Sequence, residues 1–262
     1  MCIRDSSNIV YISKEEKKIP ISDPSGRWSD LTLLPEWEEE LYDVYTVRKH
    51  GKWIMLKALK EQYRNDPKCV EILEKEFDTR YNLAHPNIVM VNDFEMVPGI
   101  GMAIVTDDAY GYSLRRLIDE KRLTPKIIQR LETQLPDALE YIQENHVMHM
   151  PISPDNIIFT EYNENLKLTN VGYDHRDRLE SQDTKRDIIN YGRLMNEVLD
   201  NLPENLPRLR KVAREAENPE GRINSIQDLK MKLRGRSQIS ITVWLLGFIV
   251  IMLALLIWLN IR

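Results

Sequence analysis

Glu76 restricts the possible folds of this chain more than any other residue. It falls within a helix that we expect over residues 66–83. Leu73, Glu76 and Arg80 share one partly apolar face of that helix by the spacing of three and four residues. A carboxylate on an inward face needs a cationic partner, and Lys57 is the natural one. The sequence therefore predicts an ion pair that holds a helix against a sheet, with two solvated surface charges as the alternative.

The residues around Lys57 and beyond the helix are typical of antiparallel strands. Apolar and polar residues alternate over residues 37–60 around His50 and Gly51, which predicts a hairpin followed by a strand. Two further strands are expected at residues 91–96 and 102–105. Together with the helix of Glu76, these strands predict a β-rich first part of the chain.

Helical spacing dominates after this part. Residues 125–144 carry apolar side chains three and four positions apart, which predicts a buried helix. Pro136 lies within this stretch and is expected to kink the helix or open a turn.

The loop that follows this helix carries a recognisable pattern. Its sequence, HVMHMPISPDNIIFTEYNENLKLTNVG, resembles the catalytic and metal-binding loops of protein kinases, H-R-D-L-K-P-x-N followed by D-F-G. Five positions match the pattern: His149, Ile152, Pro154, Asn156 and Gly172. Pro151 stands at the catalytic Asp position, Ser153 at the Lys position and Asn170 at the first position of D-F-G. The resemblance thus implies the kinase loop without its proton-transferring and charged groups.

Other motifs of this family follow in the right order. Ile54-Met55-Leu56-Lys57 resembles the strand V-A-I-K, and the segment His85-Pro86-Asn87-Ile88-Val89 resembles the link from the kinase helix to the next strand. The resemblance covers residues 30–235 and implies an α+β, two-lobed protein-kinase-like fold. We expect a small β-rich lobe at residues 30–106, a large helical lobe at 107–235 and a mobile lead-in at residues 1–29.

The resemblance also implies a nucleotide cleft. Its vestigial cofactor-binding residues are Lys57, Glu76, Thr106 and Asp107, with Thr106 at the gatekeeper position. Asn156 and Asn170 take the two metal positions, but both are neutral, and Mg²⁺ prefers anionic oxygen ligands. The metal site is therefore weak or lost.

The loop that covers the phosphates in kinases is also changed. Its three glycine positions correspond to Trp37, Glu39 and Tyr42. Bulky side chains prevent the close approach that glycine permits, and carboxylates repel a phosphate. We expect no resident cofactor, with ATP and Mg²⁺ bound weakly at most.

Two functions remain open at this point. The first is a catalytically inactive pseudokinase that acts as a scaffold or signalling interaction module with a protein partner that the sequence does not identify. Besides the changed loops, only a short segment separates Gly172 from Asp187, and it lacks A-P-E, so the platform for a peptide substrate is mostly missing. The alternative is a divergent ATP-dependent Ser/Thr protein kinase, which the retained Lys57, Glu76 and Asn156 favour.

An apolar run near the end of the sequence predicts the location of the chain. Residues 239–259 carry no charge over a length sufficient to cross a bilayer, with Trp near both ends. Basic residues precede this run, so we expect a single-pass C-terminal anchor in the lipid bilayer with the kinase-like domain in the cytoplasm. The first residues, MCIRDSS, have no apolar core of a signal peptide and resemble translated adaptor sequence. A net charge of −5 argues against a nucleic-acid partner.

Overall fold

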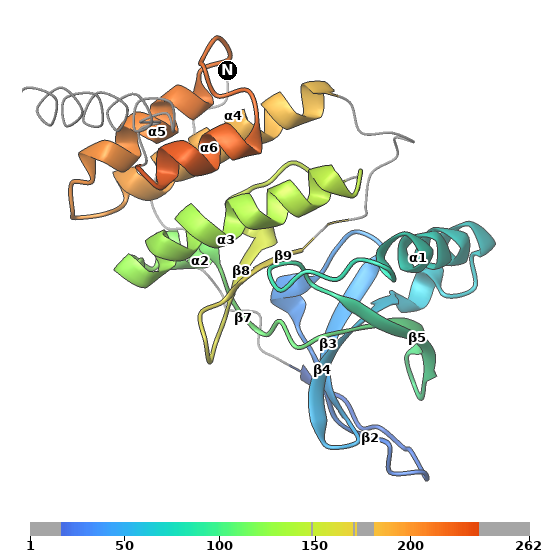
Figure 1. Cartoon of the computed structure of the whole chain (residues 1–262). Coiled ribbons are helices and arrows are strands. Elements are labelled where there is room, and N and C mark those ends of the chain that lie inside the picture. The colour runs from blue at the N-terminus through green and yellow to red at the C-terminus, as the bar shows by residue number, and fades with distance from the viewer. Residues whose placement is uncertain (1–16, 148, 170, 172–180, 236–262) are drawn as a thin grey trace, which may run out of the picture. The chain divides into compact units, whose positions relative to one another are not determined.

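The computed structural model describes residues 17–147, 149–169, 171 and 181–235 (Figure 1). The described chain divides into two compact units. The first holds the described residues within 17–117, 147–150 and 154–171, and the second holds the other described segments. The units are therefore not contiguous in sequence, unlike the split expected at residue 107.

The first unit contains two antiparallel sheets. The larger sheet has six strands in the order β1-β2-β3-β4-β6-β5 among the described residues. The smaller has three, in the order β7-β8-β9. The strands are β1 (Lys17–Lys18), β2 (Trp28–Leu33), β3 (Tyr42–Lys49), β4 (Lys52–Leu59), β5 (Val91–Val97), β6 (Gly101–Thr106), β7 (Gly111–Ser113), β8 (Ile157–Thr160) and β9 (Leu166–Leu168).

The predicted hairpin is confirmed. Strands β3 and β4 pair in register from Tyr42 opposite Leu59 to Lys49 opposite Lys52. The two turn residues between them, His50 and Gly51, have φ angles of 49° and 79°. Positive φ at both positions gives a turn whose twist matches that of the flanking strands.

Both faces of the large sheet are buried. Successive side chains of a strand point to opposite sides, so each strand contributes side chains to two separate apolar clusters. On one face Tyr45, Val47, Leu56 and other strand residues pack with Trp28. On the other face, Tyr42 and Leu59 pack with Leu73 of helix α1 (Pro67–Arg80). Lys57 alternates with Leu56, so it lies on the face that α1 covers.

The lead-in predicted for residues 1–29 is too long. Strand β1 pairs with β2, and β2 pairs with β3, so the sheet begins before residue 30. The physical reason is Trp28, which is buried in the core of the sheet although its neighbours in sequence are polar. A single aromatic side chain in a polar stretch gives too little periodicity to predict a strand.

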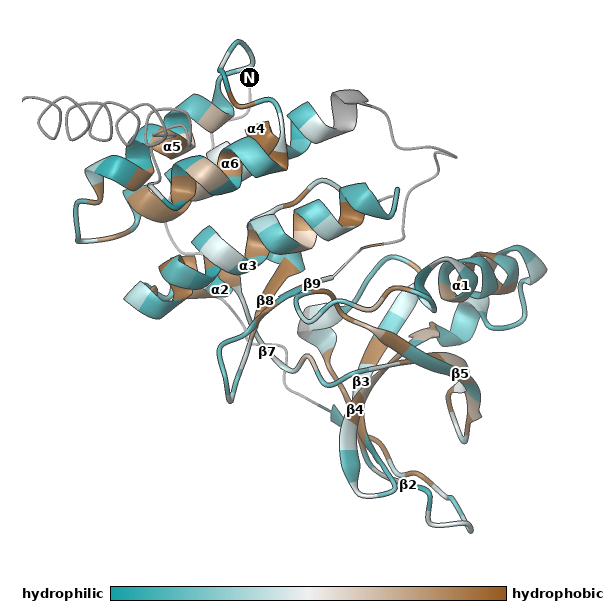
Figure 2. Cartoon of the chain, in the orientation of Figure 1, coloured by the Kyte–Doolittle hydropathy of each residue, from teal (hydrophilic) through white to brown (hydrophobic). Residues whose placement is uncertain are grey.

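The second unit is helical. Its helices are α3 (Pro125–Glu144), α4 (Ser181–Asp200), α5 (Pro207–Glu217) and α6 (Ile226–Leu233), and the short α2 (Leu114–Asp119) runs into it from the first unit. Helix α3 has the predicted bounds, because Thr124 caps its first turn by accepting a hydrogen bond from the amide of Ile127. The helix continues through Pro136 without opening a turn. Figure 2 shows apolar and polar bands alternating along α3, as its spacing requires.

Helix α5 was not among the predicted elements. Its apolar residues, Leu209, Val212, Ala213 and Ala216, are buried at helical spacing, and α5 packs against α4. The predicted membrane segment, residues 239–259, lies outside the described residues. Within the part of the chain that the structure describes, no helix is both long enough and apolar enough to cross a bilayer.

Candidate functional site

The predicted contact between Lys57 and Glu76 is confirmed. Lys57 Nζ on β4 lies 3.0 Å from Glu76 Oε1 on α1 and donates a hydrogen bond to it. Both side chains are buried, with 9% and 1% of their surface exposed. An ion pair at this depth holds α1 against the sheet, because separating the two groups would leave buried charges unpaired.

Local sequence positions α1 for this contact. Asp66 caps the helix by accepting a hydrogen bond from the amide of Lys68, and Pro67 occupies the first turn, where its missing N–H costs nothing. The buried stripe of the helix comprises Cys69, Leu73, Glu76 and Arg80. Glu76 therefore points toward the sheet by helical periodicity.

Arg80 is a second cation on the same carboxylate. Its Nη1 lies 2.7 Å from Glu76 Oε1, and its Nη2 donates to the carbonyl oxygen of Val89 at 3.2 Å. The other carboxylate oxygen, Glu76 Oε2, is buried with no hydrogen-bond partner among the described residues. Burial acts to raise the pKa of Glu76, but the charges of Lys57 and Arg80 outweigh it, so the pKa lies below its ordinary value of 4.5.

Glu39 brings a second carboxylate to Lys57. Its Oε2 lies 2.8 Å from Lys57 Nζ. Glu39 stands at the middle glycine position of the predicted phosphate loop. The neighbouring Glu38 pairs with Lys60 at 2.8 Å, so two ion pairs fix this segment to β4 and its end. The sequence predicts repulsion between Glu39 and a phosphate, but it does not predict this direct contact with Lys57.

Glu39, Lys57, Glu76 and Arg80 form what we call the ion cluster. It contains two carboxylates and two cations, so its formal charges cancel. Lys57 Nζ also lies 4.2 Å from the centre of the Tyr42 ring, a distance typical of a cation–π contact. The amine is thus surrounded by two acidic side chains and an aromatic face.

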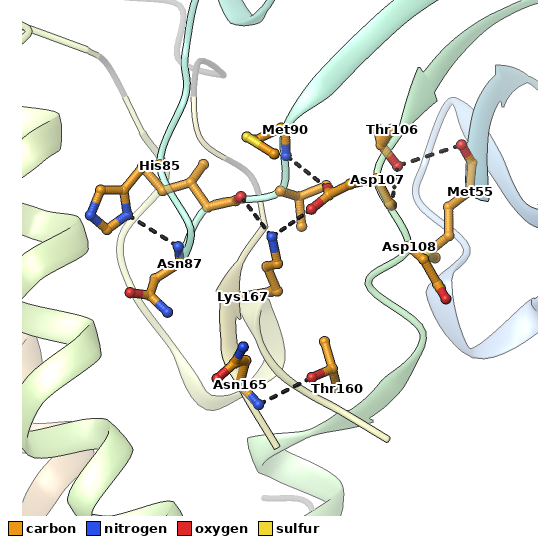
Figure 3. Close-up of polar contacts among 12 residues, drawn as sticks. Met55, His85, Asn87, Met90, Thr106, Asp107, Asp108, Thr160, Asn165 and Lys167 are labelled. Carbon is orange, nitrogen blue, oxygen red and sulfur yellow. Dashed lines mark hydrogen bonds and ion pairs between the residues drawn. The ribbon is translucent and has the colours of Figure 1, made fainter. Parts of the chain in front are cut away.

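Thr106 and Asp107 of the predicted cleft make structural contacts (Figure 3). Thr106 Oγ1 donates to the carbonyl oxygen of Asp107 at 3.1 Å and lies 3.5 Å from that of Met55. Asp107 Oδ1 accepts the amide of Met90 at 2.9 Å, and its Oδ2 lies 2.5 Å from Lys167 Nζ. The carboxylate of Asp107 is therefore occupied on both oxygens.

Lys167 was missed by the sequence reasoning. It is buried in β9 between Leu166 and Leu168, and its amine also lies 3.5 Å from the carbonyl oxygen of Ile88 (Figure 3). Strand β9 is held to the same segment by main-chain hydrogen bonds between Leu168 and both Asn87 and Val89. A lone lysine between two leucines in a predicted strand was the only available signal.

Main-chain contacts hold the described part of the loop with the kinase-like pattern. His149 is buried and forms a bridge with Val171, which lies next to the position of Asn170. The carbonyl oxygen of Asn156 accepts hydrogen bonds from the amide and hydroxyl of Thr169, at 3.0 and 3.1 Å. The structure thus brings Asn156 to the residue before Asn170, although Asn170 itself lies outside the described residues.

The side chains of this loop differ from those of the family pattern at two charged positions. Pro151 is exposed and carries no side-chain oxygen or nitrogen, and Ser153 is half-buried. Asp155 is the one carboxylate between His149 and Asn156; it is exposed and lies 3.8 Å from Arg115. Among the residues that the structure describes, no group of three His, Cys, Asp or Glu side chains is placed to hold a metal ion.

Comparison with known families gives one match over most of this region. The family described as "Protein kinase domain" matches residues 42–192. Among solved structures, the fold is similar to the crystal structure of the Mycobacterium tuberculosis PknI kinase domain, with a TM-score of 0.54 at 19% identity. That similarity covers 80% of this chain and 97% of the solved chain, and it supports a two-lobed protein-kinase-like fold.

Curated relatives are serine/threonine-protein kinases by name. The chain is 29% identical over 126 residues to the probable serine/threonine-protein kinase CPE1738 of Clostridium perfringens, covering 48% of this chain and 18% of that protein. It is 29% identical over 147 residues to PkaA of Streptomyces coelicolor, covering 55% and 27%. It is 27% identical over 135 residues to ULK3 of Xenopus laevis, covering 51% and 28%. The matched region therefore spans between 18% and 28% of the length of these relatives.

Proposed function

The chain belongs to the protein kinase domain family, and we propose that it is a catalytically inactive member that serves as a membrane-anchored scaffold or signalling interaction module. The observation that carries this proposal is the pairing of Lys57 with both Glu39 and Glu76. In the family, the lysine at this position contacts the phosphates of ATP, while the glutamate of the helix holds it in place. Here an additional carboxylate of the chain lies against the amine.

The charge balance of the ion cluster argues against nucleotide binding. A triphosphate approaching Lys57 would have to displace Glu39 or share the amine with two carboxylates. Two like charges at contact distance repel by about 1 kcal/mol even in bulk water, and by more near a protein surface. Because the formal charges of the cluster already cancel, it offers no net attraction for a phosphate.

Packing beside the ion cluster supports the same conclusion. Trp37, at the first glycine position of the phosphate loop, packs against a buried apolar cluster. This cluster comprises Leu34, Val44, Met55, Val89 and Ala109. Met55 replaces the alanine of V-A-I-K, and Ala109 follows the hinge residues after Thr106. A bulky side chain is thus packed at the first glycine position of the phosphate loop, where it leaves less room for a nucleotide than glycine would.

The donor set does not fit Mg²⁺ with ATP. Asn156 provides a neutral amide where the family places a metal ligand, and its partner position is also an asparagine. Magnesium is held in kinases by an aspartate and an asparagine together with phosphate oxygens.

A divergent Ser/Thr kinase is the second candidate. The intact contact between Lys57 and Glu76 favours it, because an active kinase needs this pair in place. The same contact has a structural reading, since a buried pair fixes α1 to the sheet whether or not a nucleotide is present.

Phosphotransfer from radiolabelled ATP distinguishes the two candidates. Wild type, Pro151→Asp and Lys57→Ala would be incubated side by side with generic protein acceptors and Mg²⁺. We expect no incorporation in any of the three, because a lost general base is only one of several changes and its repair leaves the others in place. Label in the wild-type lane that disappears in Lys57→Ala would refute the inactive assignment.

The uncharged apolar run at residues 239–259 supports a membrane anchor. Because basic residues precede this run, we propose that the described units lie in the cytoplasm. Deletion of residues 239–262 should move the protein from alkali-resistant membranes to the soluble fraction. A truncated protein that remained in the membrane fraction would contradict the assignment of the anchor.

A further inference from the structure

Helix α5 presents three cationic side chains on its exposed face. Arg208, Lys211 and Arg214 are exposed and follow one another at intervals of three residues. By helical periodicity, Lys211 and Arg214 lie opposite the buried residues of the helix, and Arg208 lies at the flank of the buried stripe. Three positive charges therefore lie along less than two turns of one helix, in a chain whose formal net charge is −5. We call these three residues the cationic face.

The acidic groups around the cationic face are largely engaged elsewhere. Glu215 on the same helix pairs with Lys232, and Glu217 accepts a hydrogen bond from Asn196 at 2.8 Å. Glu132 of α3 is close enough to Arg208 for the two charges to interact. Among the residues that the structure describes, no carboxylate pairs with Lys211 or Arg214, and both side chains face solvent.

One end of the cationic face lies next to Gly235, the last described residue. A Cβ atom on Gly235 would stand 3.0 Å from Cζ of Arg208, so this guanidinium lies directly against the last described residue. Arg234 next to it is also exposed. Only residues 236–238 separate Gly235 from the apolar run that begins at Ile239, and four residues of extended chain reach roughly 14 Å.

We propose that the cationic face of α5 docks on the surface of an anionic lipid bilayer. The inference rests on the proposed membrane anchor, because the short link to residue 239 would hold Arg208 near the headgroups. Anionic headgroups attract basic side chains close to the cytoplasmic surface of a membrane. Each basic side chain at such a surface favours contact by a factor of about five, so three multiply to roughly a hundredfold.

The test measures how fast the amine of Lys211 is acylated in the full chain reconstituted into vesicles. An uncharged acetylating reagent is used, and modified peptides are quantified by mass spectrometry. In vesicles containing phosphatidylserine, we expect acylation of Lys211 to be slower by about tenfold or more than in vesicles of phosphatidylcholine alone. Salt at 1 M, where the Debye length is about 3 Å, should abolish the difference. Lys52 and Lys68, which are exposed in the first unit, serve as internal references.

A pair of variants separates lipid docking from simple proximity. Arg208→Gln with Arg214→Gln keeps Lys211 as the reporter and removes two of the three factors of about five, so most of the protection should disappear. Lys52→Gln with Lys68→Gln removes the same charge from the first unit and should leave the protection of Lys211 unchanged. Equal rates for Lys211 in both kinds of vesicle would overturn the proposal.

Two other outcomes are informative. Protection that rises with the number of chains per vesicle, independent of lipid charge, would mean that the face contacts another copy and would also overturn the proposal. The anchor is read separately, from alkali-resistant retention in phosphatidylcholine vesicles. Loss of that retention contradicts the anchor, whereas retention without charge-dependent protection contradicts only the docking of α5.

Discussion

The ion cluster and the loop from His149 to Asn156 differ in the number of their charged side chains and in how closely those side chains are paired. The cluster has four charged side chains within 3.0 Å of a partner. The loop has one carboxylate, Asp155, which is exposed. In active members of the family both regions act on the nucleotide or the acceptor. Here the first retains Lys57 and Glu76, whereas Pro151 and Ser153 stand at the charged positions of the second.

The two regions are stabilised by different kinds of contact. The charges of the cluster contact one another and connect α1 to the sheet, so they contribute to the folded state without any ligand. The loop keeps its shape through main-chain contacts, such as those of Asn156 with Thr169, which do not depend on the identity of its side chains. A catalytic aspartate at position 151 would add nothing to those contacts, and proline stands there.

The largest effect is expected from Glu76→Ala. Removing this carboxylate leaves the ammonium of Lys57 and the guanidinium of Arg80 buried with their shared partner gone. We expect the free energy of unfolding to fall by about 3–5 kcal/mol, measured by urea denaturation of the detergent-solubilised chain. Glu74→Ala, on the exposed side of the same helix, is the control and should change it by less than about 0.5 kcal/mol. A loss for Glu76→Ala no greater than for this control would mean that the cluster does not hold α1.

Acid should weaken the same cluster. Because the pKa of Glu76 is lowered in the folded protein, its contribution to stability is present above pH 4.5, the ordinary value, and is lost as the pH falls through the folded value. The difference in stability between wild type and Glu76→Gln should therefore shrink as the pH decreases below 4.5. A difference that stayed constant down to the acid unfolding of the protein would contradict this assignment.

Asp107→Ala should have the next largest effect. The change leaves Lys167 buried in β9 without its carboxylate and removes the acceptor for the amide of Met90. We expect a loss of about 2–3 kcal/mol in the free energy of unfolding. The double variant Asp107→Leu with Lys167→Met should recover most of this loss, because no buried charge then remains. Failure of the double variant to improve on Asp107→Ala would argue against the ion pair as the cause.

Glu39→Gln should have the smallest effect on stability. The side chain of Glu39 is 35% exposed, and Lys57 keeps Glu76 when Glu39 is neutralised. Solvent screening limits the expected loss to below about 1 kcal/mol, measured in the same denaturation series. A loss as large as that of Glu76→Ala would place Glu39 in the structural part of the cluster and weaken the comparison with the loop.

Sequence alone predicted the local features and one long-range contact. The hairpin at His50 and Gly51 and the bounds of α3 depend on turn and capping residues, which act over a few positions. The contact of Lys57 with Glu76 could be predicted because an inward carboxylate on a helix requires a cation. The stripe of α5, Leu209, Val212, Ala213 and Ala216, carried the same kind of signal and could have been found.

The remaining contacts depend on tertiary geometry. Glu39 has two acidic neighbours in the sequence, and nothing in that run indicates which of them reaches Lys57. The pairing of Asp107 with Lys167 joins residues 60 positions apart, and its geometry is set by the pairing of β9 with the segment before β5. The burial of Trp28 likewise depends on strands that follow it in the chain.

Nucleotide binding tests the central claim most directly, that Lys57 is engaged by the chain and not available to a phosphate. Thermal unfolding of wild type and Lys57→Ala would be followed with and without ATP and Mg²⁺. A ligand at 100 times its Kd stabilises a protein by about 2.7 kcal/mol, which shifts the Tm by several degrees. The account predicts no shift for either protein at millimolar ATP. A shift in wild type that is lost in Lys57→Ala would contradict it.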